Sequence, residues 1–155
     1  MDYPSEENRH QADHADLLIQ SYHTLLGKEL IAGIAAEPNF ARSLFHAPIA
    51  VISHDTAPDP VFNYANLKAL ELFEMNWDEF THMPSRLSAE PAERAEREKL
   101  LASVRVHGYV YPLQGVRESK AGRRFRINEG AVWNLIDADR RYRGQAACFF
   151  AWEYL

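Results

Sequence analysis

The chain has 155 residues, 46% of them hydrophobic, and a formal net charge of −5. This length and composition fit one globular domain with its own core, and they exclude a disordered, collagen-like or disulfide-rich chain. No stretch is apolar enough to span a bilayer, and the negative charge gives no general attraction to nucleic acid or anionic lipid. We therefore expect neither a membrane nor a nucleic acid as a partner.

The expected location is the cytoplasm. The N-terminal residues lack the basic start and the apolar segment of a secretory signal. Cys148 is the only cysteine, so the chain cannot form an internal disulfide, which fits a reducing compartment.

The first predicted element is a helix. Residues 1–14 are polar and are expected to form a flexible tail, and residues 15–155 are expected to form the domain. Apolar residues recur at spacings of three and four over residues 15–34, which predicts an amphipathic helix. Such a helix either covers a sheet or pairs with a copy of itself, and we expect a homodimer formed through it.

Two short strands and two short helices are predicted next. Residues 49–53 and 61–66 are strand-like runs on either side of a proline-containing turn, as in a hairpin. Asn66 stands at the N-cap position of a helix over residues 67–75, and a second helix is predicted over residues 77–83.

The remaining chain predicts one longer helix and three long strands. A capping sequence with a proline at residues 88–91 begins the helix, and Gly108 ends it. Beyond Gly108 the apolar period changes to two, which predicts antiparallel strands over residues 109–119, 123–137 and 140–155. Five strands with helices over one face form an α+β arrangement.

Several sequence phrases together resemble one known family. FNYAN at residues 62–66, PSRLSAEP at 84–91 and VWNL at 132–135 resemble the MEKHLA domain, and the likeness covers residues 15–155. This PAS-related family includes stand-alone bacterial proteins and the C-terminal part of plant class III homeodomain leucine-zipper proteins. The resemblance implies a PAS-like fold with a five-stranded antiparallel sheet, and it implies a sensory role.

Seven residues are candidates for a ligand pocket between the sheet and the helices. They are Tyr64, Asn66, Phe73, Trp77, Arg86, Trp133 and Asn134. Asn66 resembles the asparagine that ends the second strand of PAS domains, and it either caps the next helix or contacts a ligand. Phe73 and Trp77 either fill the gap between helices and sheet or line a pocket there.

Arg86 has two possible roles, and Trp133 and Asn134 have two possible orientations. The Arg86 guanidinium binds either an internal carboxylate, such as that of Glu90, or a carboxylate on a ligand. Trp133 and Asn134 are adjacent in a predicted strand and therefore point to opposite faces, so only one of them is expected to look inward.

No metal site or catalytic site is predicted. The seven histidines form no zinc-binding pattern, although haem needs only one axial ligand, such as His82 or His107. Cys148 lacks the asparagine-cysteine-arginine-phenylalanine context of flavin-binding light sensors. The sequence has no nucleophile paired with a base and no glycine-rich phosphate loop. The cofactor is therefore unassigned, and we do not expect an enzyme.

Three functions are compatible with these patterns, and the first is favoured. It is a PAS-like sensory domain that binds a small molecule between sheet and helices and signals through dimerisation. The second is a ligand-free protein interaction module, and the third is a small enzyme with a carboxylate or histidine in the cavity. A cavity beneath Tyr64, Phe73 and Trp133 favours the first function, whereas a close-packed core there favours the second.

Overall fold

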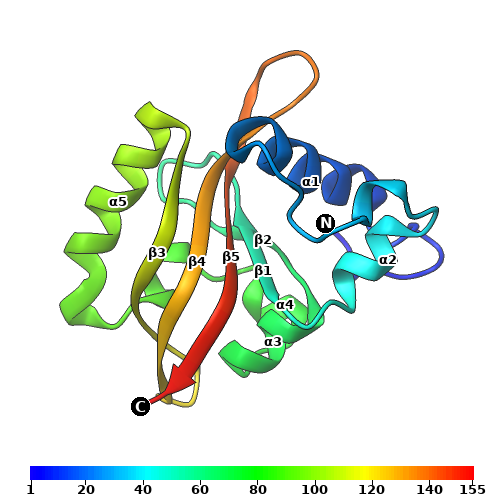
Figure 1. The fold of residues 1–155 in the computed structure, drawn as a ribbon. Helices are drawn as coiled ribbons and strands as arrows, with labels where there is room; N and C mark the ends of the chain where they lie inside the picture. The colour runs from blue at the N-terminus through cyan, green and yellow to red at the C-terminus, as the bar shows by residue number, and fades with distance from the viewer.

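The protein is described by a computed structural model that covers all 155 residues. A five-stranded antiparallel sheet has the order β2-β1-β5-β4-β3, and helices lie on both sides of it (Figure 1). The strands are β1 (Ala50–His54), β2 (Phe62–Ala65), β3 (Tyr109–Glu118), β4 (Arg124–Ile136) and β5 (Tyr142–Tyr154). The α-helices are α1 (Ala12–Leu26), α2 (Phe40–Phe45), α3 (Leu67–Phe73), α4 (Trp77–Phe80) and α5 (Arg94–His107). The predicted α+β class and the five-stranded antiparallel sheet are confirmed.

Helix α1 is shorter than the helix predicted over residues 15–34. It ends at Leu26 because Gly27 takes a left-handed conformation, with φ of 74°, and its N–H group bonds to the carbonyl of His23. A short 3₁₀ turn (Ile34–Ala36) and α2 follow. The sequence pattern predicts neither of them, because it predicts a single helix that continues to residue 34.

The N-terminal residues lie against the domain. The ring of Tyr3 packs edge-on against Phe45, with ring centres 5.4 Å apart. The indole N–H of Trp77 donates to the carbonyl of Met1 over 3.1 Å. Helix α1 begins at Ala12, inside the segment predicted to be a tail. The flexibility expected for residues 1–14 stays a prediction.

Helix α1 covers one face of the sheet. Its residues Leu18, Ile19 and Tyr22 are buried, and the ring of Tyr22 meets that of Trp133 on β4 edge-on, with centres 4.9 Å apart. The indole N–H of Trp133 also donates to the carbonyl of Leu18 over 3.3 Å. Of the two roles predicted for this helix, the structure shows the covering role, and its apolar stripe is buried within a single chain.

Helices α3, α4 and α5 lie on the opposite face (Figure 1). Between the sheet and the first two of these helices lies a layer of phenylalanine rings. Phe62 stacks on Phe80 with ring centres 4.2 Å apart, and Phe73 packs edge-on against Phe125 at 5.5 Å. This layer fills the space beneath Phe73 with aromatic carbon.

Asn66 connects the start of α3 to the strands. Its side-chain oxygen accepts from the backbone N–H groups of Ala69 and Val51, over 3.1 and 3.0 Å. Its amide nitrogen donates to the carbonyls of Leu44 and Ile49, over 3.1 and 2.7 Å. The predicted helix cap is confirmed, and the same side chain also ties α2 to β1.

Helix α5 starts later than predicted. Two 3₁₀ turns (Ser85–Ser88 and Pro91–Glu93) precede it, and the helix proper begins at Arg94. Ala89, between the two turns, is extended and forms an isolated antiparallel bridge with Arg117 of β3. This bridge holds the chain away from the helical conformation that the capping sequence predicted.

Strand β3 forms one edge of the sheet. Its pairing with β4 shifts register between Val110 and Leu113 and again between Leu113 and Gly115. Pro112 lies within the first of these irregular stretches and has no backbone N–H to donate.

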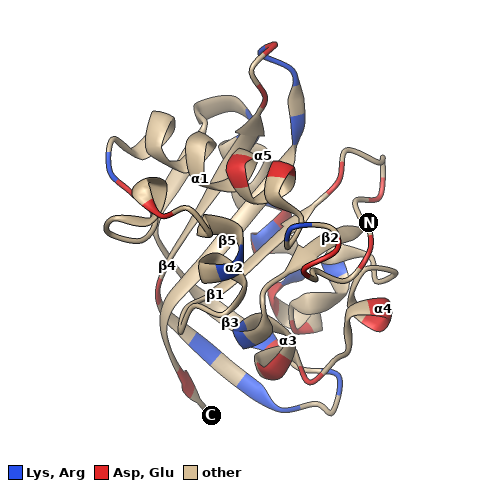
Figure 2. Cartoon of the chain, turned by 90° about the vertical axis from the view of Figure 1, so that its right-hand side faces the viewer, with Lys and Arg blue, Asp and Glu red and all other residues tan.

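Lysine and arginine residues gather at the ends of the two long hairpins, where the ribbon of Figure 2 is coloured blue. They are exposed, and most of them pair with acidic side chains. Arg126 lies 3.2 Å from Glu153, and Arg143 lies 3.4 Å from Asp137. None of the helices has the length and apolar character needed to cross a bilayer.

His14 predicts a measurable pH dependence of stability. Its Nε2 lies 2.8 Å from the hydroxyl of Ser53. Burial lowers its pKa from 6.5 to about 4, with smaller contributions from Arg143 and the N-terminal amino group. The unfolded chain therefore takes up a proton before the folded chain does, and stability is lost as pH falls from 6.5 toward 4.

We expect the free energy of unfolding to be about 1–2 kcal/mol lower at pH 5 than at pH 7 from this histidine alone. Urea denaturation at the two pH values measures the total loss, to which His54 also contributes because burial lowers its pKa too, and His14→Gln should reduce the loss by the share of His14. An equal pH dependence in the variant would show that other groups cause it.

Candidate functional site

A small cavity lies on the face of the sheet that α5 covers, between β1, β5 and α5. Its free volume is about 30 Å³, which holds about one or two water molecules. Nine of its fifteen lining residues are hydrophobic. The polar ones are Ser53, His54, Ser88, Arg97, Arg117 and Gln145.

His54 places an unpaired acceptor in this buried region. Its Nδ1 lies 2.9 Å from the carbonyl of Asp55, and because a carbonyl only accepts, Nδ1 carries the proton. Nε2 is then a bare acceptor, and it is buried without any hydrogen-bond partner. Burial, with the charge of Arg97 as a further cause, lowers the pKa of His54, so the ring is neutral near pH 7.

A glycine allows β5 to approach β1 beside this histidine. A Cβ atom at Gly144 would lie 2.0 Å from the carbonyl oxygen of His54. Gly144 also has a φ of 122°, which side-chain-bearing residues rarely adopt. Any other residue at this position would therefore push the two strands apart next to the cavity.

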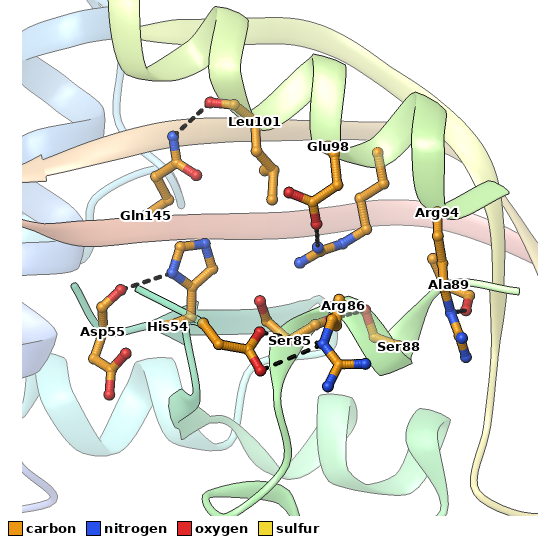
Figure 3. Close-up of polar contacts among 12 residues, drawn as sticks. His54, Asp55, Ser85, Arg86, Ser88, Ala89, Arg94, Glu98, Leu101 and Gln145 are labelled. Atoms are coloured by element: carbon orange, nitrogen blue, oxygen red, sulfur yellow. Dashed lines mark hydrogen bonds and ion pairs between the residues drawn. The ribbon is translucent and has the colours of Figure 1, made fainter. Parts of the chain in front are cut away.

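Gln145 and Asn134 connect the sheet to α5. The Gln145 amide nitrogen donates to the carbonyl of Leu101 over 3.0 Å and to the Asn134 side-chain oxygen over 3.2 Å. Asn134 in turn donates to the carbonyl of Val104 over 3.0 Å. Figure 3 shows His54 and Gln145, from neighbouring strands, pointing into the same space below α5. These amides fix the helix above the cavity.

Arg97 enters the cavity from α5. It is 7% exposed, and its only side-chain hydrogen bond is to Glu98 over 3.4 Å. The side chain of Glu98 is 62% exposed, so its charge lies largely in solvent. Burial lowers the pKa of Arg97 to about 10, and the guanidinium remains charged at neutral pH.

Arg117 enters from β3 and has even less compensation. It is also 7% exposed, it has no ion pair, and its one hydrogen bond is to the carbonyl of Val116. Burial and the positive charge of Arg97 lower its pKa to about 10, against the opposing effect of the Glu93 carboxylate. A Cβ atom at Gly115 would lie 3.1 Å from its Nη1, so the glycine leaves the room that this guanidinium occupies.

The two arginines separate the cavity from a larger surface groove. The groove, of about 240 Å³, lies between α5 and β3 and shares Arg97 and Arg117 with the cavity. Glu93 and Glu96 line its outer part. A molecule in the groove would therefore meet both guanidinium groups before it reached His54.

The seven candidate residues predicted from sequence lie elsewhere. None of them lines the cavity, and a ligand contact by any of them stays a prediction. Tyr64 and Trp77 pack edge-on at the β2 edge, with ring centres 5.9 Å apart. Phe73 belongs to the phenylalanine layer, and Asn66 is the cap described above.

Arg86 binds an internal carboxylate, which is one of its two predicted roles, but the partner is Asp59 and not the example given, Glu90. Arg86 pairs with Asp59 over 3.2 Å at the surface, and Glu90 pairs with Arg124 over 3.1 Å. The extended residue Ala89 separates the turn that carries Arg86 from the next one, so the two side chains do not share a helix face.

Trp133 and Asn134 point to opposite faces, as the alternation predicts. Trp133 faces α1 and Asn134 faces α5, and both are buried. The expectation that only one of them looks inward is wrong, because helices cover both faces of the sheet and both side chains look into packed protein.

The remaining reactive groups do not meet in this cavity. Cys148 is fully buried on β5, next to Ala147, which lines the cavity, so its thiol points to the α1 face. No three histidine, cysteine or acidic side chains lie close enough together to hold a metal ion.

Comparison with known proteins gives a consistent picture. A family model described as the MEKHLA domain matches residues 12–154. The rice homeobox-leucine zipper protein HOX10 is 26% identical over 138 residues, which are 88% of this chain and 16% of that protein. A second rice protein of this kind, HOX29, is 25% identical over 145 residues. The chain thus spans 16% of the length of these curated relatives.

Solved structures share the fold. A PAS domain from Colwellia psychrerythraea has a TM-score of 0.61 at 12% identity, over 74% of this chain and 92% of that one. A light-oxygen-voltage domain studied with a flavin analogue has a TM-score of 0.60 at 16% identity, over 78% and 87%. An RNA-binding light-oxygen-voltage receptor has a TM-score of 0.57 at 21% identity, over 77% and 34%. At these identities the likeness concerns the fold alone.

Proposed function

The chain belongs to the MEKHLA domain family, and from this membership and the PAS-like fold we propose that it is a sensory module that binds a small molecule and catalyses no reaction. The proposed site is the cavity between the sheet and α5. Homodimerisation is the proposed output.

One observation carries this proposal, namely the polar lining of a buried cavity. Buried polar groups in folded proteins are almost always paired. Here His54 Nε2 is buried without a partner, and Arg97 and Arg117, whose other nitrogens reach solvent, make one side-chain hydrogen bond each. A ligand that pairs with these groups would remove the cost of leaving them unsatisfied.

The sheet itself can pass a signal from the cavity to α1. Along β4, Asn134 faces α5 and its neighbour Trp133 faces α1, and across the strands Asn134 pairs with the cavity residue Gln145 while Trp133 pairs with Ala146. A shift of Gln145 or Asn134 on ligand binding therefore moves the backbone that supports Trp133, on which α1 packs. In this proposal ligand binding changes the population of α1 positions and, through it, the dimer.

A second candidate function is a ligand-free interaction module. It is favoured by the small free volume of the cavity, about 30 Å³, because pockets for drug-sized ligands measure about 300–1,000 Å³. The ligand-binding proposal therefore requires a small molecule, or one that extends into the groove.

The small free volume of the cavity also argues against a flavin as the ligand. One of the structural neighbours is a light-oxygen-voltage domain studied with a flavin analogue. The chain's only thiol lies on the opposite face of the sheet from the cavity. The residues present do not fit a flavin, and no light-driven chemistry is proposed.

Native mass spectrometry tests the proposal. Protein purified from cells without denaturation is expected to carry a stoichiometric small molecule and to show a dimer. Ala147→Leu, which fills the cavity from β5, should lose the added mass, whereas Ala151→Leu on the exposed part of the same strand should keep it. Wild-type protein without added mass would favour the interaction module, and a cavity-filling variant that retains the mass would show that the ligand binds outside this cavity.

A further inference from the structure

The charges around the cavity indicate which class of molecule binds there. We propose that the ligand is a small monocarboxylate that also carries a hydroxyl group, with its carboxylate between Arg97 and Arg117 and its hydroxyl on His54. This inference rests on the proposed function, because it assigns the chemistry of the same site.

First, the positive charges of Arg97 and Arg117 have little negative charge near them. Arg97 and Arg117 are each 7% exposed, and the only carboxylate within ion-pair distance of either is the solvent-exposed one of Glu98. Two buried cations close enough to perturb one another are costly unless an anion lies between them, and Glu93 offsets the charge of Arg117 only from beyond ion-pair distance. A ligand carboxylate at this position supplies the missing negative charge.

The second argument is the number of free donors. A guanidinium has five N–H donors, and Arg97 and Arg117 use one each in side-chain hydrogen bonds. The remaining donors have no acceptor in the protein and reach solvent, since none of them is among the fully buried atoms without a partner. Two parallel N–H groups of a guanidinium match the two oxygens of a carboxylate, so the unpaired donors suit this group.

The third argument concerns His54. Its Nε2 is a bare acceptor, because Nδ1 donates to the carbonyl of Asp55. An acceptor lone pair repels a carboxylate but accepts from a hydroxyl. The cavity therefore offers guanidinium donors on one side and, on the other, the acceptors His54 Nε2 and the Gln145 side-chain oxygen, which matches a hydroxy acid and does not match a simple fatty acid.

Charges at the rim restrict the ligand further. Glu93 and Glu96 line the outer groove next to the arginines. They repel a second negative charge on any ligand that reaches into the groove. A single carboxylate is therefore favoured over a dianionic phosphate.

Calorimetric titration of the full chain with lactate and glycolate tests this inference. Both are expected to bind, whereas lactamide, which lacks the charge, should not bind. Propionate, which lacks the hydroxyl, should bind more weakly than lactate. Arg117→Met is expected to weaken lactate binding about 10- to 100-fold, the worth of a hydrogen bond to a charged group.

The control is Arg126→Met, because Arg126 is an exposed arginine of the adjacent strand. It should leave lactate affinity unchanged. Arg117→Met is expected to fold, since removing a poorly compensated buried charge is seldom destabilising.

Three results would overturn the assignment while leaving a ligand sensor in place. They are tighter binding of inorganic phosphate or lactamide than of lactate, no lactate or glycolate binding by a protein that carries another small molecule, and Arg117→Met with full affinity. If no compound binds and natively purified protein carries no added mass, the proposed function fails as well.

Discussion

Replacing Asn66 by alanine is expected to lower the free energy of unfolding by about 3–5 kcal/mol, because it leaves several buried backbone groups unpaired at once. The backbone N–H groups of Val51 and Ala69 lose their acceptor. The carbonyls of Leu44 and Ile49 lose their donor. Urea denaturation of wild type and variant measures the difference.

Asn76→Ala is the matched control. Asn76 caps α4 in the same way, with a capping box to Glu79, but both of its hydrogen bonds are exposed. Its loss is expected to cost about 1 kcal/mol, as for an ordinary helix cap. Equal losses for the two asparagines would mean that Asn66 is only a cap and does not hold α2 and β1 together.

Replacing Trp133 by alanine is expected to cost about 3–5 kcal/mol, as for other large aromatic side chains removed from a core. Trp133 is fully buried and is the point at which α1 meets β4. The variant should also expose α1, so limited proteolysis is expected to cleave within Ala12–Leu26 well before the rest of the chain.

Trp152→Ala controls for the loss of a large ring alone. Trp152 lies on β5 and is only partly buried, so its removal should cost less than half as much and leave α1 protected. If α1 stays protected in the Trp133 variant, its attachment to the sheet does not depend on this contact, and the route proposed for the signal is wrong.

The elements that the sequence predicts well are those that a local signal specifies. The cap at Asn66, the stop at Gly108 and the alternation of the last three strands each depend on a few neighbouring residues, and the structure places these elements within a few residues of the prediction. The end of α1 was also signalled locally, by Gly27, but the apolar spacing that continues to Ile34 outweighed it.

The cavity had no local signal. His54 stands at the end of β1, Arg97 on α5 and Arg117 on β3, so neither a motif nor a spacing connects them. These three residues matter because their polar or charged groups are buried with few partners. Only the fold shows this burial. A hint was present in the sequence as Gly115, two residues before Arg117, but a strand glycine has many explanations.

Neither did the sequence predict that both faces of the sheet are covered. The pairing of α1 with the sheet depends on contacts such as that of Tyr22 with Trp133, more than a hundred residues away along the chain. Periodicity shows that a helix has an apolar face, but it does not show whether a strand or a second chain covers that face.

The irregular pairing of β3 also affects how copies of the chain can associate. An edge strand with regular free backbone groups invites strand addition, and therefore sheet extension and aggregation. In β3, Pro112 removes one donor and two register shifts interrupt the row of free groups. A second chain cannot extend the sheet along this edge in continuous register, so self-association by edge-to-edge growth into fibrils is opposed by the strand's own sequence.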